Sequence, residues 1–586
     1  MTQLQQASPG QAAPAAPRLG LQPVLSRLVG PALAAPVTIW LVLTFAAPFA
    51  VVMLLALQEF PDPFGPLVQP PSLAQFRIVF GDAFYIGVII ETLLLGLAVT
   101  VATVALGYPL ALWLTRLPVA WRPLGFAIIL IPLLTNVVVR SLGIVLLLAP
   151  DGLINQVLAL AGLGPIRGML YTHGAVMVAL AQVFMPFMVL ALYDILQGAS
   201  PRIDEAARSL GATRIRRVWL IDLPLSLPGL RSGVVIVFLM ASTAYVSATL
   251  LGGRKVWTTG MLVWQEALQN LNAPLAAALA LVMTLTSSLF AVGAFLLARR
   301  LMPWSAGRAP SRWSLPEWVL RVLDLVGPPL GKILLVAALL LLLLPLALVC
   351  IQSFNDVPQA TVAGFRGFTL KWYERVLFGG AYVDSFIVSA QLALASAAAA
   401  MALALPAAFA LARFRFRGLT GLAVFWTMPL SLPHVAIGVG MLRLLQAYTA
   451  LPPFFGLMAV HVVLVLPFCI ALLQTSVEQL DRAQEEAGAS LGAGAFQRLV
   501  FIIAPGLAPG LAAAGIMSFL LSFGEVTVTS FLTTARMTTL PVRIYAESTF
   551  SLEPTVHAVS AALIVVTILA LLLLNRLVRL DRLHAR

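Results

Sequence analysis

Charged residues are scarce in this sequence, and their scarcity excludes an ordinary soluble domain. The chain of 586 residues is 10% charged and 60% hydrophobic, whereas a soluble domain carries about 25% charged residues. Cysteine is also nearly absent. Cys350 and Cys469 both fall inside apolar runs, so neither a disulfide framework nor a thiol site is indicated. Most of the chain must therefore face lipid or other membrane helices.

Motifs for catalysis and metal binding are missing as well. GPPLGKI at 327–333 comes nearest to a phosphate loop, but it is one residue short and has Ile333 where a hydroxyl is needed. The sequence has no triad and no paired acids. Its histidines have no metal-ligand spacing, and they are His173, His434, His461, His557 and His584. We therefore expect no catalytic residue, metal or cofactor site in this chain, and a hydrogen-bonded structural role for His434 and His461.

Long apolar runs are what the sequence has instead. Twelve runs reach the roughly 20 residues that a membrane-spanning helix needs. They lie near 32–57, 84–115, 123–148, 171–197, 228–251, 275–299, 331–354, 384–412, 419–446, 454–475, 509–532 and 555–575. The pattern predicts an all-α polytopic membrane protein with about twelve transmembrane helices, six in each half.

Basic residues indicate how these helices are oriented. With the N-terminus in the cytoplasm, about 24 basic residues fall in inward loops and about nine in outward loops. The net charge of +13 is explained by this bias, so no nucleic-acid partner is predicted. Both termini are expected to be cytoplasmic. An even number of spans per half gives the halves the same orientation, so the six-helix repeats are parallel.

The two halves also share sequence. Residues 204–230 recur at 485–511, a constant 281 residues later, with 12 of 27 aligned positions identical. A second similarity relates 107–116 to 404–413 at an offset of 297. We interpret these repeats as an internal duplication. The predicted organisation is a disordered cytoplasmic tail (1–30), a first repeat (31–300), a cytoplasmic linker (301–330), a second repeat (331–576) and a basic cytoplasmic tail (577–586).

Each shared stretch is a polar segment between apolar runs, and we call residues 200–226 the first elbow and residues 481–507 the second elbow. Ser200 and Asp481 are suited to cap a short helix at its start. Gly211 and Gly492 can end that helix in a left-handed conformation. A second short helix is then expected to stop before Pro224 or Pro505.

The elbows resemble a known motif. The first contains Glu205, Ala206, Ala207, Gly211, Ile221 and Pro224, and the second contains Glu486, Ala487, Gly488, Gly492, Ile502 and Pro505. This pattern resembles the EAA loop of permeases in binding-protein-dependent ABC importers. The second copy has Gly488 in place of an alanine, and a small residue still fits there. The resemblance implies a type I ABC importer permease-like fold whose loops dock on cytoplasmic ATPases.

The same resemblance implies partners and a location. They are two cytoplasmic ABC ATPase subunits, which hold ATP and Mg, and an extracytoplasmic solute-binding protein, assembled in a bacterial inner membrane. Residues 137–163 and 185–196 look like the first permease of spermidine/putrescine-type importers. Residues 428–442 and 538–548 look like the second. A fusion of two permeases that transports a polyamine is therefore favoured, with ferric iron, an opine or an aminophosphonate as alternatives.

Ionisable residues inside the spans are candidates for the substrate path, because such residues are costly in a bilayer. They are Glu525, Arg140 and Glu91, with Tyr245 and Trp264 as possible cation–π surfaces. Glu525 either attracts an ammonium group or forms a buried bridge with Arg140 or Arg443. Two other classes of protein stay open at this point: an ion-coupled secondary transporter with the same layout, and a membrane scaffold that transports nothing.

Overall fold

The computed structural model describes residues 22–59, 69–198, 201–301, 316–361, 363–430, 432–447, 452–534, 537–551 and 553–578. Within these ranges the regular structure is helical, apart from two isolated β-bridges, Asn355–Phe368 and Thr534–Met537. Eleven described helices are long and apolar enough to cross a bilayer, and one bent pair, Leu419–Leu430 with His434–Ala447, makes a twelfth. The prediction of an all-α polytopic membrane protein with about twelve spans is confirmed.

The first half contains seventeen of the described elements. They are α1 (Gln22–Leu41), η1 (Val42–Ala46), α2 (Ala47–Ala56), α3 (Ala74–Gly81), α4 (Ala83–Thr115), η2 (Val119–Trp121), α5 (Arg122–Leu134), α6 (Val137–Leu148), α7 (Leu153–Leu160), α8 (His173–Leu196), α9 (Pro201–Ser209), α10 (Arg214–Arg217), η3 (Val218–Asp222), α11 (Leu223–Thr243), α12 (Val246–Gly252), α13 (Thr259–Leu268) and α14 (Ala273–Leu301).

The second half repeats most of this order, without a described counterpart of α7. Its elements are α15 (Glu317–Gln352), α16 (Lys371–Phe378), α17 (Ala381–Arg413), α18 (Leu419–Thr427), η5 (Met428–Leu430), α19 (His434–Ala447), α20 (Pro453–Gln479), α21 (Arg482–Ser490), α22 (Ala495–Arg498), η6 (Leu499–Ile503), α23 (Ala504–Phe523), α24 (Thr529–Leu532), α25 (Leu540–Ala546), η7 (Glu547–Ser551) and α26 (Thr555–Val578).

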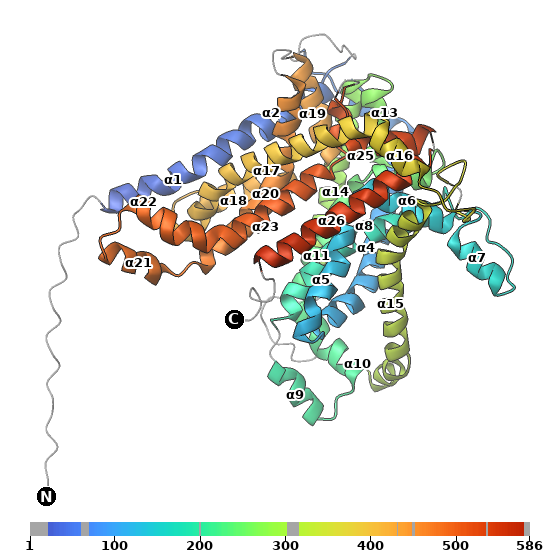
Figure 1. Ribbon diagram of the computed structural model, residues 1–586, viewed down its shortest axis with the longest axis horizontal. Coiled ribbons are helices and arrows are strands. Elements are labelled where there is room, and N and C mark those ends of the chain that lie inside the picture. The colour runs from blue at the N-terminus through green and yellow to red at the C-terminus, as the bar shows by residue number, and fades with distance from the viewer. Residues whose placement is uncertain are drawn as a thin grey trace, which may run out of the picture.

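Three helices form the centre of each half. Helices α4, α8 and α11 pack on one another in the first half, and α17, α20 and α23 pack on one another in the second. Figure 1 shows that the two bundles meet at one end and diverge toward the other, where α9 and α10 lie at the tip of one bundle and α21 and α22 at the tip of the other. Both elbows thus lie at the diverging ends.

The first span of each half packs on the opposite half, which the sequence analysis does not predict. Helix α15 packs on α4 and α6, and α1 and α2 pack on α17 and α19. An added Cβ at Gly143 would lie 2.3 Å from the Pro345 carbonyl oxygen, and one at Gly440 would lie 2.3 Å from that of Pro48. The two contacts are related by the 297-residue offset. Glycine is required there because backbone of the other half occupies the space of a side chain.

Four of the predicted spans are broken rather than continuous. The third span breaks at Thr135–Asn136, where the Asn136 side chain accepts a hydrogen bond from the Val138 N–H and so starts α6. The fifth span breaks at Ala244 and Tyr245, between α11 and α12. In the second half, the segments before and after the α18–α19 break are bent by 92°, and another break separates α23 from α24. Irregular backbone at membrane depth is tolerated where it lines a cavity.

Two predicted boundaries differ from the structure. Helix α1 begins at Gln22, although a disordered tail is predicted to residue 30. Helix α15 begins at Glu317, so residues 317–330 of the predicted linker are helical, and the GPPLGKI segment lies inside this helix. Apolar residues at helical spacing continue through both stretches. The rest of these predictions falls on 1–21, 302–315 and 579–586, which lie outside the described residues.

Candidate functional site

The first arm of each elbow is a short helix closed by glycine. Gly211 has φ of 76° and Gly492 has φ of 87°. The Ala212 N–H donates to the Ala207 carbonyl, and the Ala493 N–H donates to the Gly488 carbonyl. These bonds satisfy carbonyls that the helix end leaves open, as in a Schellman motif. The predicted glycine break is confirmed in both elbows.

The start of these helices is only partly as predicted. The Asp481 carboxylate accepts a hydrogen bond from the Ala483 N–H and caps α21. Ser200 lies outside the described residues. The first elbow's helix begins at Pro201, where a proline is tolerated because the first N–H groups of a helix have no partner inside it.

The second arm of each elbow does not stop before the proline, so that prediction is wrong. In the first elbow, α10 continues through the π-helix η3 into α11, and Pro224 lies in the first turn of α11. In the second, α22 continues through η6 into α23, with Pro505 in the first turn. A π-turn shifts the hydrogen bonds by one residue, which lets a helix pass a proline. Each elbow is therefore continuous with a membrane helix.

The predicted coupling residues have the same exposure in both elbows. Glu205 and Ala206 are exposed and Ala207 is buried, while Glu486 and Ala487 are exposed and Gly488 is buried. An added Cβ at Gly488 would lie 2.5 Å from the Ile502 side chain, so the glycine leaves room for that isoleucine. The small residue faces inward and the glutamate faces outward in each copy.

Two leucines that the sequence analysis did not select stand at the elbow tips. Leu210 is 87% exposed and Leu491 is 89% exposed, and they are related by the 281-residue offset. Each elbow thus presents an apolar side chain to solvent at the same position. The sequence could have pointed to them, since both are among the identical positions when residues 204–230 are aligned with 485–511.

Equivalent arginines tie the elbows to the second span of each half. Arg116, just after α4, pairs with Asp222 at 2.8 Å, and Arg413, at the end of α17, pairs with Glu485 at 3.0 Å. The arginines are related by the 297-residue offset, whereas the acids are not at equivalent positions. Each elbow is thus held to the second span of its own half by an ion pair.

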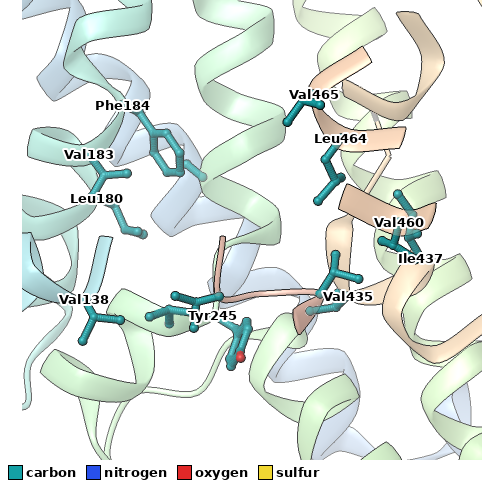
Figure 2. Packing of buried hydrophobic residues seen from close by; sticks show 14 of the residues in the cluster. Val138, Leu180, Val183, Phe184, Tyr245, Val435, Ile437, Val460, Leu464 and Val465 are labelled. Atoms are coloured by element: carbon teal, nitrogen blue, oxygen red, sulfur yellow. The ribbon is translucent and has the colours of Figure 1, made fainter. Parts of the chain in front are cut away.

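A cavity of about 470 Å³ lies between the halves, at the four helix breaks. Its lining residues fall within 133–140, 180–187, 235–247, 427–434, 461–468 and 520–527. Figure 2 shows Leu180, Val183 and Phe184 of α8 on one side, Leu464 and Val465 of α20 on the other, and Tyr245 below them. The walls are mainly apolar, with a few polar groups where the helices break.

Glu525 lies in this lining, as the sequence analysis predicts for the path. Its carboxylate accepts a hydrogen bond from the Val528 N–H at 2.8 Å, which holds the carboxylate at the break after α23. Among the described residues, no ion pair joins it to a basic side chain. The alternative of a bridge to Arg140 or Arg443 is therefore not what the structure has.

Arg140 lines the same cavity and is buried. Its guanidinium donates to the Val183 carbonyl at 3.3 Å, and its Nε has no hydrogen-bond partner among the described residues. A buried guanidinium nitrogen without a partner is unfavourable unless another group reaches it. The cavity thus contains one acidic and one basic group that are not paired with each other.

Tyr245 joins the two halves beside the cavity. Its hydroxyl is hydrogen-bonded to Ser530 of the other half at 2.6 Å, and its ring contacts Tyr545 edge-on at 6.0 Å between centroids. Trp264 stacks on the same ring at 6.2 Å but is not among the cavity-lining residues. A second bond between the halves runs from the Asn136 side chain to the carbonyl of Gly524.

The remaining candidates fall in two places. His461 lines the cavity and is hydrogen-bonded through its two ring nitrogens to Ser522 and Thr529, which confirms the structural role predicted for it. Glu91 does not reach the cavity. It lies exposed on the outer surface of α4, with its carboxylate 3.6 Å from His173, because the helix turns this position away from the bundle.

Comparison with known proteins places this geometry in context. A family profile described as "Binding-protein-dependent transport system inner membrane component" matches residues 144–307 and 392–581, one segment in each half. The chain is 32% identical over 210 residues to the spermidine/putrescine transport system permease protein PotB of Escherichia coli K12, covering 36% of this chain and 76% of PotB. It is 28% identical over 241 residues to PotC of the same strain, covering 41% of this chain and 90% of PotC.

A likeness among solved structures is weaker. A chain in the crystal structure of a bacterial alginate ABC transporter, in complex with an alginate pentasaccharide-bound periplasmic protein, aligns with a TM-score of 0.41 and 17% sequence identity. That alignment covers 48% of this chain and 98% of the other.

Proposed function

Because this chain belongs to the binding-protein-dependent transport system inner membrane components, we propose that it is the complete membrane domain of an ABC importer. One chain supplies both halves of the translocation path. Two ATPase subunits dock on the elbows in the cytoplasm, and they bind the ATP and Mg. A solute-binding protein delivers the solute on the opposite face. Both termini lie on the cytoplasmic side with the elbows.

The pair of equivalent elbows carries this proposal. Each presents an exposed glutamate and an exposed leucine, at Glu205 and Leu210 and at Glu486 and Leu491. Two equal surfaces on one chain fit two equal partners related by a twofold axis. An ion-coupled secondary transporter has no need for a duplicated protein-docking surface.

The solute class we propose is a polyamine. PotB and PotC are named as spermidine/putrescine permeases, and they are similar to this chain. In the cavity between the halves, Glu525 supplies a carboxylate that forms no ion pair with any described basic residue. Such a carboxylate attracts an ammonium group, and the attraction is stronger beside apolar walls than in bulk water. The apolar walls suit the methylene chain between two amines.

A second candidate solute carries an acid group as well as an amine. Arg140 favours it, because its Nε has no partner and its guanidinium lines the same cavity. An opine or an aminophosphonate would place its amine at Glu525 and its acid group at Arg140. Uptake of radiolabelled spermidine, an opine, an aminophosphonate and ferric iron, each with its own binding protein, separates these solutes.

The bonds between the halves explain how such a path would open. The bond between Tyr245 and Ser530 and the bond between Asn136 and Gly524 both join one half to the other beside the cavity. They lie beside the cavity between the halves, whereas the elbows lie at the diverging ends of the bundles (Figure 1). ATP-driven approach of the two elbows would swing the halves apart at this end, and these bonds would break to admit the solute.

The experiment is to co-express the chain with a candidate ABC ATPase from the same organism, purify the pair into nanodiscs and measure ATP hydrolysis with and without the loaded binding protein. The double variant E205R and E486R should no longer copurify with the ATPase. Reversing two exposed charges at the contact changes binding strongly while leaving the fold intact. Loss of copurification, with normal yield of the permease, supports docking at the elbows.

The matched control is E374R, which reverses an exposed glutamate on α16, far from either elbow. It should leave copurification unchanged. If no ATPase binds the unmodified chain, and a proton or sodium gradient drives uptake equally in the unmodified chain and in the double variant, the importer proposal is wrong and the chain is a secondary transporter.

A further inference from the structure

The seventh membrane helix, α15, is longer than a bilayer requires. Its 36 residues span about 54 Å at the usual rise per residue, whereas the hydrocarbon core is about 30 Å thick. Pro328 and Pro329 lie inside the helix, and prolines kink a helix. Figure 1 shows the lower end of α15 turning beside α10. We call residues 317–327, before the prolines, the α15 extension.

One face of the α15 extension is bound to the first elbow by ion pairs and a hydrogen bond. Arg216 pairs with Glu317 at 2.7 Å and with Asp324 at 2.9 Å. The Thr213 hydroxyl also donates a hydrogen bond to the Asp324 carboxylate. These contacts fix the extension at the level of α10, which is joined to the membrane helix α11 by the five residues of η3. The extension therefore lies close to the membrane surface.

The adjacent face of the extension is apolar, and none of the residues that the structure describes covers it. Trp318 is 70% exposed, Val322 is 53% exposed and Leu325 is 78% exposed. Their spacing of four and three places them on one side of the helix, and we call these three residues the apolar stripe. The exposed apolar residues Ile333 and Val336 continue beyond the prolines on the membrane part of the same helix.

This continuity identifies what covers the stripe. Beyond the prolines, the exposed apolar side chains of α15 can only face lipid, and the stripe of the extension runs on from them. Tryptophan is enriched at membrane interfaces. Arg321 and Lys332 are exposed, and basic side chains there meet phospholipid headgroups. The α15 extension has the pattern of an amphipathic helix that lies in the interface.

We propose that the α15 extension lies in the bilayer surface, with Trp318, Val322 and Leu325 inserted below the headgroups and Arg321 at the phosphates. Because its other face holds Arg216, this helix would keep the first elbow at a fixed height above the membrane. The second elbow has Gln497 and Gly494 where the first has Arg216 and Thr213, so these two contacts to the extension belong to the first elbow.

Spin labels can measure this insertion directly. A single cysteine is placed at 318, 322 or 325 in a background with C350A and C469A, labelled, and reconstituted in phospholipid nanodiscs. The exposure of each label to oxygen, which partitions into lipid, is compared with its exposure to a water-soluble nickel chelate. We expect labels at 322 and 325 to show a several-fold higher oxygen-to-nickel ratio than a label at 210.

Position 210 is the matched control, because Leu210 and Leu325 are similarly exposed and differ in whether the proposal places them in lipid. Equal nickel exposure at 210, 322 and 325 would falsify the proposal. Protection of 322 and 325 that appears only after the ATPase is added would also overturn it, since the stripe would then bind protein. If the cysteine-free background does not fold, photo-crosslinking residues at 322 and 325 in the unmodified chain should capture phospholipid, and capture of the ATPase alone would refute the proposal.

Discussion

At the scale of single residues, the cavity is defined by two charges that do not neutralise each other. Glu525 is held by a backbone N–H, and Arg140 by a backbone carbonyl. A charge in the membrane that lacks a partner of opposite sign is costly, and we propose that a solute passing between the two groups offsets this cost. The two residues can be removed separately, and the two candidate solutes respond differently.

For a polyamine, E525Q should raise the KM for transport about tenfold or more, because a hydrogen bond to a charged group contributes about 1.5–3 kcal/mol. Glutamine keeps the oxygen that accepts the Val528 N–H, so the helix break stays intact. R140Q should change the KM for spermidine little or improve it. Uptake of radiolabelled spermidine into proteoliposomes that contain the assembled importer measures the KM of each variant.

A solute that carries an acid group as well as an amine should respond to both substitutions. If R140Q abolishes uptake of an opine or an aminophosphonate, and E525Q also weakens it, the solute carries both charges. An E525Q variant that transports every tested solute with unchanged KM would remove Glu525 from the path.

At the scale of elements, the two elbows are alike in backbone and unlike in their supports. Both are closed by a left-handed glycine and both run through a π-turn into a membrane helix. Among the described residues, only the first elbow forms ion pairs with α15, and it does so through Arg216. The pairs are partly exposed, so each contributes little alone, and their effect should be on order rather than on overall stability.

R216Q gives the first elbow the residue that the second elbow has at this position, Gln497. We expect faster amide hydrogen exchange in residues 213–217 and 317–327 together, because the pairs hold the two segments to each other. Melting temperature should change little. Q497A in the second elbow is the control and should leave both segments unchanged. Faster exchange in 213–217 without any change in 317–327 would contradict the linkage.

At the scale of the whole molecule, the halves interlock. The first span of each half packs on the other half, with Gly143 against Pro345 and Gly440 against Pro48. The sequence similarity suggests two units joined by a linker. The packing means that neither half buries its own surfaces without the other.

A chain divided between α14 and α15 should therefore still assemble. Co-expressed residues 1–308 and 309–586 are expected to copurify through a tag on one of them. Adding G143L and G440L should abolish this association, because side chains would be forced into backbone only 2.3 Å from the added Cβ, and overpacking costs about 1–3 kcal/mol per site. The control is G421L, at a glycine with nothing within 4 Å of an added Cβ. Failure of the unmodified halves to copurify would show that the covalent linker is needed.

The features predicted correctly are those that depend on neighbouring residues along the chain. Apolar runs set the number of spans, and the glycines of the elbows need a left-handed backbone wherever the rest of the chain lies. Errors arise where this local information ends. The predicted stop before Pro224 does not allow for the π-turn that carries the helix past the proline. The predicted tail and linker are too long because helices α1 and α15 begin before their membrane-spanning parts.

The sequence by itself determined the membrane class, the duplication, the glycine-closed elbows and the kinship to importer permeases, because hydropathy, repeat identity and turn chemistry are local properties. Only the tertiary structure decided that the third and fifth spans break at one cavity, that the first spans exchange between halves and that Glu525 lines the cavity while Glu91 does not. The physical reason is that the membrane-spanning helices are apolar on most sides. Which face of such a helix turns inward is set by its packing against neighbours.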